Sequence, residues 1–330
     1  IIDSLKQITT SYDRSQELLN EISPEIQVLF PSIERLALAK THIDNVGTDT
    51  DNVDTLNIIF IQAPEGISND QVNKLKEYIL TKQHRALRRK VEDDLPAIYA
   101  AEGLSAEERM TRRFEYLCAH ETPVVLPDER IAFLRTLCDI PHIYSEEEFA
   151  ALKSEKRLHE LGFHSNVTPD YEKLLRHGLL YFRDSTDGYG ARSIDALISL
   201  CDRYVAEAKK VGNDEVATTI ERVSRYGATS FLEALQLFRI IHFAIWLEGN
   251  YHVTVGRFDK YMYPYFKADL DSGKITMDEA AMLVEEFFLS FNRDSDLYPG
   301  IQQGDNGHSM VLGGYDFDGT SRYNGLTDLC

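Results

Sequence analysis

Residues 230–259 read SFLEALQLFRIIHFAIWLEGNYHVTVGRFD and carry the strongest structural signals in the chain. From Thr229 to Glu248 the sequence is apolar on almost every side, which predicts a long helix at the centre of the fold. A glycine then permits the chain to turn, and Tyr251–Val255 is predicted as a short strand. Gly256 leaves a bare backbone that another element can approach closely. The stretch therefore predicts a buried helix that leads into a strand.

Capping patterns and periodicity place further elements. The tetrads Ser105–Glu108, Ser145–Glu148 and Thr276–Glu279 have the Ser/Thr-x-x-Glu pattern of a capping box, and each predicts the start of a helix. Apolar residues at helical spacing from Ile194 to Val211 predict an amphipathic helix. Ser309–Leu312, which follows Gly-rich turns, is predicted as a strand.

The first eighty residues give weaker signals. A helical period covers Asp13–Leu29, a β-branched run at Leu56–Ile61 predicts a strand, and Asp70–Leu80 is predicted as a capped helix. No chemistry can be assigned to this region from its residues.

The composition excludes several classes of protein. The 330 residues carry 54 acidic and 35 basic side chains, and the formal net charge of −19 repels nucleic-acid phosphates and anionic lipid head groups. Hydrophobic residues make up 43% of the chain, enough for a sizeable core, which excludes global disorder. No secretory signal opens the sequence. We therefore expect a cytoplasmic protein with neither nucleic acid nor membrane as a partner.

Cysteines and histidines do not form a recognisable metal motif. The four cysteines are widely spread, which suggests neither a disulfide framework nor a zinc site. Five histidines lie between His120 and His177, but no pair has the i, i+4 spacing with an adjacent Glu that zinc hydrolases use. No metal is expected, and a zinc hydrolase would require metal in elemental analysis.

Several blocks occur in a fixed order along the chain. They are His164–Val167, Pro169–Leu175, Ser230–Gln236, Leu247–Asn250, Thr254–Asp259, Tyr261–Tyr265, Asp269–Ala281 and Leu312–Gly319. In this order they resemble the glycyl radical enzymes of the pyruvate formate-lyase family. The resemblance covers roughly Lys82 to the end, and it departs at Gly325, where the family has a Glu in an Asn-Glu-Leu run.

The resemblance implies a helix-rich α/β fold that forms part of a ten-stranded barrel surrounded by helices. Residues 82–330 would be the first half of a pyruvate formate-lyase-like catalytic domain, and residues 1–81 an N-terminal segment of unknown role. Because the family's chain is more than twice as long, and because this sequence lacks an initiator Met, we expect a partial or processed chain that is inactive alone. At full length the resemblance implies a homodimer.

The family's chemistry implies a protein glycyl radical, installed by a separate activating enzyme that uses S-adenosylmethionine and an iron-sulfur cluster. A thiyl cysteine then abstracts hydrogen from a small-molecule substrate. Both residues are expected outside this chain: Cys330 follows a segment that the family places on a helix before its catalytic loop. Arg222–Tyr226 resembles the radical loop, but Arg225 occupies the position of the glycine. No catalytic residue is therefore predicted within the chain.

Three residues are candidates for contact with substrate. The resemblance implies that His164 lines the pocket, where an imidazole with a pKa near neutrality could act as a general acid or base; the alternative is a core histidine. It also implies that Thr254 hydrogen-bonds a substrate hydroxyl; the alternative is an ordinary strand residue. Arg257 could form a structural ion pair with Asp259, bind a substrate carboxylate or cap a helix.

The favoured function is a glycyl radical lyase or dehydratase acting on a small organic substrate. One alternative is pyruvate formate-lyase (formate C-acetyltransferase), which uses coenzyme A. Another, from a different class, is a non-catalytic helical protein of the same family used for binding or assembly. A histidine at position 164 favours the dehydratase type.

Overall fold

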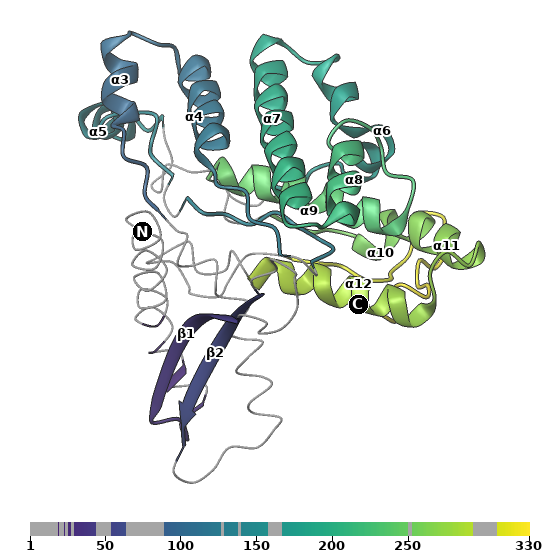
Figure 1. Ribbon diagram of the computed structural model, residues 1–330. Coiled ribbons are helices and arrows are strands. Elements are labelled where there is room, and N and C mark those ends of the chain that lie inside the picture. Colours follow the sequence, from purple (N-terminus) through teal and green to yellow (C-terminus); the bar gives the residue numbers. More distant parts are fainter. Residues whose placement is uncertain are drawn as a thin grey trace. The chain divides into compact units, whose positions relative to one another are not determined.

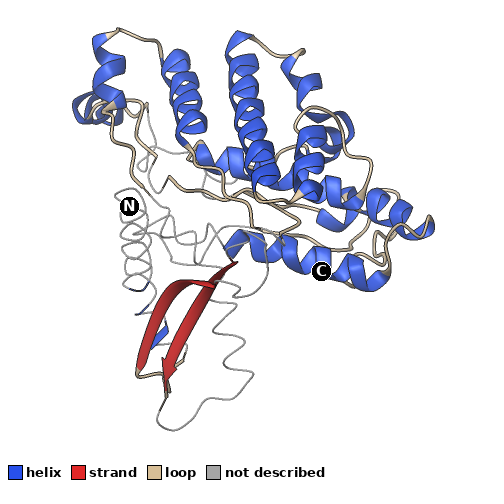
Figure 2. Cartoon of the chain, in the orientation of Figure 1, coloured by secondary structure: helices blue, strands red, loops and turns tan. Residues whose placement is uncertain are grey.

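The computed structural model describes residues 30–43, 54–63, 89–126, 129–137, 140–157, 167–249, 253–292 and 309–330, with Leu19, Ser23, Ile26 and Gln27. The chain divides into two compact units, residues 1–88 and 89–330 (Figure 1). Figure 2 shows a pair of strands in the first unit and the helices of the second.

The first unit contains an antiparallel pair of strands. Strand β1 (Arg35–Ile43) pairs with β2 (Asp54–Gln62), and the register sets Arg35 opposite Gln62. The strand predicted at Leu56–Ile61 is confirmed as the middle of β2. The helix predicted at Asp70–Leu80 lies outside the described residues, as does most of the one predicted at Asp13–Leu29.

The described part of the second unit consists mainly of helices. Their bounds are α3 (Leu95–Ala101), α4 (Ala106–His120), α5 (Glu146–Ser154), α6 (Tyr171–Arg183), α7 (Gly188–Lys210), α8 (Asp214–Val223), α9 (Phe231–Leu247), α10 (Phe258–Tyr261), α11 (Tyr263–Asp271) and α12 (Met277–Asn292). Helix α7 packs between α4 and α8, and α9 is contacted by α6, α8, α11 and α12. Figure 1 shows α4 and α7 side by side.

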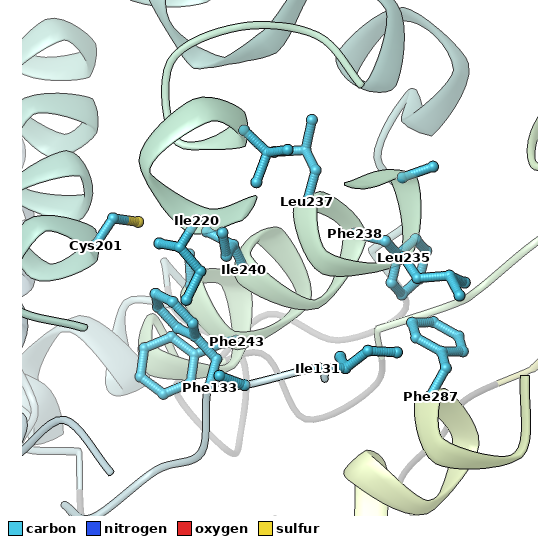
Figure 3. Close-up of a cluster of buried hydrophobic side chains, with 14 of the residues drawn as sticks. Ile131, Phe133, Cys201, Ile220, Leu235, Leu237, Phe238, Ile240, Phe243 and Phe287 are labelled. Carbon is cyan, nitrogen blue, oxygen red and sulfur yellow. The ribbon is translucent and has the colours of Figure 1, made fainter. Parts of the chain in front are cut away.

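Helix α9 is the centre of the core, as its sequence predicts. Thirteen of its 17 residues are buried. Its Phe238 stacks on Tyr171 of α6 with ring centroids 4.2 Å apart and meets Phe287 of α12 edge-on at 5.2 Å. One turn and a half further on, Phe243 meets Phe133 edge-on at 5.2 Å. Figure 3 shows these phenyl rings on both sides of the helix, so aromatic packing joins it to three separate parts of the chain.

Two buried polar contacts fix the position of α9. The side-chain amide of Gln236 accepts a hydrogen bond from the Ala132 N–H at 2.9 Å and donates one to the Ala132 carbonyl at 3.3 Å. At the start of the helix, Asp269 accepts a hydrogen bond from the Phe231 N–H at 2.7 Å. This carboxylate satisfies an N–H that the helix leaves unpaired and complements the positive end of the helix dipole.

The capping predictions are confirmed with one difference. Ser145 and Glu148 exchange side-chain and backbone hydrogen bonds in both directions at the start of α5. At the start of α4 the Ser105 hydroxyl accepts the Glu108 N–H, but the Glu108 carboxylate pairs with Arg112 and Arg192 instead of returning to the cap. Charge attraction within and between helices thus replaces half of that capping box.

The helix predicted at Ile194–Val211 begins earlier than expected. Helix α7 starts at Gly188, where the Asp187 carboxylate accepts the Gly190 N–H. Glycine has a low helix propensity, so the apolar pattern and propensity do not predict this first turn. The Asp187 cap is the local signal for it. In the described part of the chain, no helix combines the length and apolarity needed to cross a membrane.

Phe238→Ala should lower the free energy of unfolding of the second unit by about 3–5 kcal/mol, because it leaves a cavity among the aromatic rings that surround α9. Phe317→Ala removes the same atoms from a fully exposed side chain and should change it by at most about 0.5 kcal/mol. Chemical denaturation followed by circular dichroism measures both. Equal effects would contradict the central position of α9.

Candidate functional site

Three extended segments that are distant in sequence are joined by isolated parallel β-bridges. Val167 bridges Val253, and the Thr254 N–H donates to the Val167 carbonyl at 2.9 Å. On the other side Gly256 bridges Met310, and the Val311 N–H donates to the Gly256 carbonyl at 2.9 Å. Residues 253–256 are thus the middle of a short parallel ladder. Pairing is confirmed for 253–255 of the first predicted strand and for 309–311 of the second.

The ladder has two different faces. Val253 and Val255 are fully buried, and Val255 belongs to the hydrophobic core, whereas Thr254 between them is half-buried. Successive strand side chains point to opposite faces, so Thr254 points away from the core.

The flanking strands show the same alternation. Val167 is half-buried and lines a cavity with residues of α4, α6, α7 and α9, and the half-buried Met310 packs against the core. Thr168, Ser309 and Val311 are exposed. We call the side formed by Thr168, Thr254, Ser309 and Val311 the Thr254 face.

A β-bulge at Gly256 interrupts the ladder. The N–H groups of Val255 and Gly256 both donate to the Ser309 carbonyl, at 3.0 and 3.1 Å, so two residues of one strand oppose one of the next. Gly256 has φ +69°, which favours glycine. An added Cβ would lie 3.5 Å from Thr168 Cγ2, an ordinary contact. Glycine is therefore favoured here by its backbone conformation, and the approach of Thr168 would leave room for a Cβ.

Arg257 follows the bulge and is held by the last described segment. Its Nη1 donates to Asp316 Oδ1 at 3.3 Å, and its Nη2 donates to the Gly313 carbonyl at 3.1 Å. The predicted ion pair with Asp259 is therefore wrong, because the carboxylate that Arg257 contacts lies 59 residues further along the chain. Binding of a substrate carboxylate by Arg257 stays a prediction.

Asp316 gathers three cationic side chains. Besides Arg257, the Lys260 ammonium lies 3.5 Å from Asp316 Oδ1, and the Arg322 guanidinium donates to Oδ2. The hydrogen bond from Arg322 is the main cause that lowers the pKa of Asp316 to about 2. The carboxylate is therefore ionised at neutral pH and ties the turn at 313–322 to the end of the ladder.

Asp259 provides a second anchor for the same segment. This fully buried carboxylate accepts the Gly313 N–H and the Thr327 hydroxyl on Oδ2, each at 2.6 Å. Its own carbonyl accepts from the Asn324 side-chain amide at 3.0 Å. These three hydrogen bonds join Asp259 to residues 313–327, so Asp259 fixes where the strand at 309–311 leaves the ladder.

The described cysteines have the character of buried thiols. Cys118 of α4 and Cys201 of α7 are buried, and burial raises the pKa of both. Burial, with a smaller effect of the Asp259 charge, raises the pKa of Cys330 to about 12, so this thiol stays protonated at neutral pH. Cys138 lies outside the described residues.

The segment Arg222–Tyr226, which resembles a radical loop, has structural contacts. The Arg225 carbonyl accepts the Leu180 N–H at 3.1 Å, and its guanidinium pairs with Asp202. Gly178 passes so close that an added Cβ would lie 2.3 Å from the carbonyl carbon of Tyr226. These contacts show that the segment packs closely between α6 and the turn that joins α8 to α9.

His164 lies outside the described residues, so its position in the pocket stays a prediction. Within the described ranges, no group of three or more His, Cys, Asp or Glu side chains is arranged to hold a metal ion. The structure therefore offers no observation that favours the zinc hydrolase.

A cavity of about 300 Å³ lies on the helical side of the ladder. Apolar residues of α4, α6, α7 and α9 line it together with Val167, and Ser193 and Glu248 are its polar members. The Glu248 carboxylate and carbonyl both accept from Arg113 Nη2, at 2.9 and 3.0 Å. The charge of Glu248 is therefore already balanced, and we take the Thr254 face as the candidate site because its polar groups are available.

Comparison with known proteins agrees with this geometry. Residues 141–330, more than half of the chain, match the protein family described as pyruvate formate lyase-like. The chain belongs to this family. Residues 18–83 match a domain family of unknown function, DUF8492, which assigns no role to the first unit.

The characterised proteins to which this chain is similar include dehydratases. It is 27% identical over 190 residues to (2S)-3-sulfopropanediol dehydratase of Klebsiella oxytoca, covering 51% of this chain and 23% of the relative. It is 25% identical over 140 residues to trans-4-hydroxy-L-proline dehydratase of Clostridioides difficile, covering 42% and 18%. The chain thus spans about a quarter or less of the length of these curated relatives.

Solved structures share the fold. The B12-independent glycerol dehydratase of Clostridium butyricum superposes with a TM-score of 0.61 at 20% identity, covering 81% of this chain and 46% of the other. A helix-rich α/β fold of the glycyl radical enzyme type is thereby established for the described part of the family member. The closed ten-stranded barrel stays a prediction.

Gly256→Ala should lower the free energy of unfolding by about 1–2 kcal/mol, because alanine resists the positive φ of the bulge while its Cβ finds ordinary contact. Gly188→Ala at the start of α7 is the matched control: its Cβ meets open space, and its effect should be neutral or stabilising. Chemical denaturation measures both. A cost at Gly188 equal to that at Gly256 would show that φ is not the cause.

The Asp316 anchor should depend on pH. Its folded pKa of about 2 lies below its ordinary value of 3.8, so the stabilisation is fully present above pH 4 and is lost as the pH falls towards 2. Backbone amide signals of residues 313–322 in NMR spectra should therefore shift over that range. Asp316→Asn should reduce the transition to the part that belongs to Asp318, whose pKa is also lowered and whose carboxylate accepts the Thr320 N–H. A transition of unchanged size in this variant would contradict the assignment.

Proposed function

We propose that this chain forms part of a glycyl radical enzyme of the lyase or dehydratase type that acts on a small organic substrate, with the Thr254 face lining the substrate site. The observation that carries the proposal is the parallel ladder: helices bury one face, and the other presents a half-buried hydroxyl. Parallel sheets are normally covered on both faces, so this ladder fits the wall of a ten-stranded barrel.

The radical chemistry requires groups outside this chain. A protein glycyl radical, installed by an activating enzyme that uses S-adenosylmethionine and an iron-sulfur cluster, and a thiyl cysteine would supply hydrogen abstraction. The residues of this chain bind and orient the substrate and keep water out. The full-length enzyme is proposed to be a cytoplasmic homodimer.

Each candidate residue has a defined task in this proposal. The Thr254 hydroxyl donates to or accepts from a substrate hydroxyl, and His164 assists loss of the leaving hydroxyl as a general acid or base. Arg257 uses one N–H of each terminal nitrogen for Asp316 and the Gly313 carbonyl, so it can contact a substrate carboxylate only with the N–H groups that remain. The proposal therefore gives Arg257 mainly the task of holding the turn at 313–316.

The two alternative functions differ from this one in the substrate that they would convert. A formate C-acetyltransferase would convert pyruvate in the presence of coenzyme A, and a non-catalytic family member would convert nothing. The characterised relatives described above, which act on a sulfonated diol and a hydroxylated amino acid by their names, support the dehydratase type.

The test is anaerobic turnover by the full-length native protein after activation. We expect conversion of a hydroxylated substrate in a screen of propane-1,2-diol, glycerol, hydroxyproline, and pyruvate with coenzyme A. Turnover of pyruvate alone would favour the acetyltransferase, and no turnover despite a glycyl radical in the electron paramagnetic resonance spectrum would favour the binding protein.

Thr254→Val should lower kcat/KM for the converted substrate about 2- to 10-fold, because one neutral hydrogen bond is lost without a change of side-chain volume. Cys330→Ser, measured in parallel, should keep kcat within about 2-fold, because the thiyl cysteine is expected elsewhere. Loss of all activity in Cys330→Ser with the fold intact would identify Cys330 as the thiyl site and overturn that expectation.

A further inference from the structure

Three hydroxyl side chains lie on one face of three adjacent strands. Thr168 lies next to Val167 in the first strand, Thr254 lies in the middle strand, and Ser309 lies at the start of the third strand. Their sequence positions are at least 55 residues apart. Only the parallel register brings them together, and neither local sequence pattern nor periodicity indicates the group.

Backbone contacts set the spacing of the three hydroxyl residues. The 2.9 Å bond from the Thr254 N–H to the Val167 carbonyl places Thr168 next to Thr254 on the same face. A Cβ added to Gly256 would lie 3.5 Å from Thr168 Cγ2, so the Thr168 side chain lies next to the bulge. The Ser309 carbonyl accepts both N–H groups of the bulge, so Ser309 borders Thr254 from the other side.

None of these three hydroxyls forms a side-chain hydrogen bond with another described residue. By contrast, other hydroxyls of the chain do find internal partners: Ser290 donates to the Phe287 carbonyl at 2.6 Å, and Thr327 donates to Asp259. A half-buried hydroxyl such as Thr254 needs a partner once the face is covered. Thr168 and Ser309 are exposed, so their hydroxyls are also open to a ligand that itself carries hydroxyls.

Charge favours a neutral ligand group at this face. Thr168, Thr254 and Ser309 are uncharged, and the nearest described cation along the middle strand, Arg257, is paired with Asp316. A sulfonate or carboxylate would have no charge-assisted partner among these residues, whereas a hydroxyl can both donate and accept. Bulges are common beside active sites because they re-aim side chains, and Gly256 lies in the middle of this group.

We propose that Thr168 and Ser309 join Thr254 in a subsite that binds the neutral hydroxyl groups of a polyol-type substrate, so that these two residues determine specificity for hydroxylated over deoxygenated substrates. This inference rests on the proposed function, because it places the substrate on the Thr254 face. It adds two residues and a chemical preference to that function. Both are specificity residues that contact the substrate, and no bond is made or broken by them.

Binding to the unactivated full-length protein tests this subsite without radical chemistry. The probes are propane-1,2-diol and propan-1-ol, which differ by one hydroxyl, and saturation-transfer difference NMR reports the dissociation constant of each. We expect the diol to bind at least about 5-fold more tightly than the alcohol. Thr168→Val and Ser309→Ala should each weaken diol binding about 2- to 10-fold and leave binding of the alcohol nearly unchanged.

Thr186→Val is the matched control, because Thr186 is an exposed threonine in the α6–α7 connection, away from the ladder. It should bind both probes as the wild type does. Diol binding that is equally tight in Thr168→Val, Ser309→Ala and wild type would overturn the inference, as would equal affinity of the wild type for the two probes. Circular dichroism of each variant excludes misfolding as the cause of a loss.

The same measurements separate this inference from the proposed function. Radical turnover of a substrate by a protein that does not discriminate the two probes would retain the glycyl radical function and overturn the hydroxyl subsite. Discrimination that depends on Thr168 and Ser309 in a protein that never turns over would retain the subsite and overturn the radical function.

Discussion

Burial of α9 on all sides is the constraint on which the rest of the second unit depends. A helix with apolar residues around its whole circumference is stable in water only if other elements surround it. Helices α6, α8, α11 and α12 do so, together with the extended segment at 129–137 that Gln236 binds. Since each buried phenyl group contributes about 1.5–3 kcal/mol, these neighbours are fixed in place by α9.

The position of α9 also decides the orientation of the candidate site. The middle strand follows this helix after only a few residues and therefore lies beside the core. One face of the strand must then pack against the core. Val253 and Val255 take the buried positions, and strand alternation then leaves Thr254 on the other side. A shift of register by one residue would bury the hydroxyl and expose two valines, which makes the observed face the stable one.

Local elements of this fold could be predicted from the sequence, and distant contacts could not. The helices and two of the capping boxes are specified by residues within one turn of each other, such as Ser145 and Glu148. The partner of Arg257 shows the opposite case. Asp259 is the nearest acid along the sequence, but Asp316 is the one that the fold brings to the guanidinium, and no local pattern carries that information. Thr254 could be identified as a candidate, whereas Thr168 and Ser309 required the register.

Two carboxylates explain how such a distant contact can form a defined site. Asp259 and Asp316 hold the segment at 313–327 from two directions, one through buried hydrogen bonds and the other through three cations. Because the strand at 309–311 enters this anchored segment, its pairing with Gly256 is restricted in both register and direction. The middle strand is thus fixed at its start by α9 and at its end by these two acids. The hydroxyl group of Ser309 is then held beside Thr254 by contacts that never touch a substrate, and preorganisation of this kind is what a binding site needs.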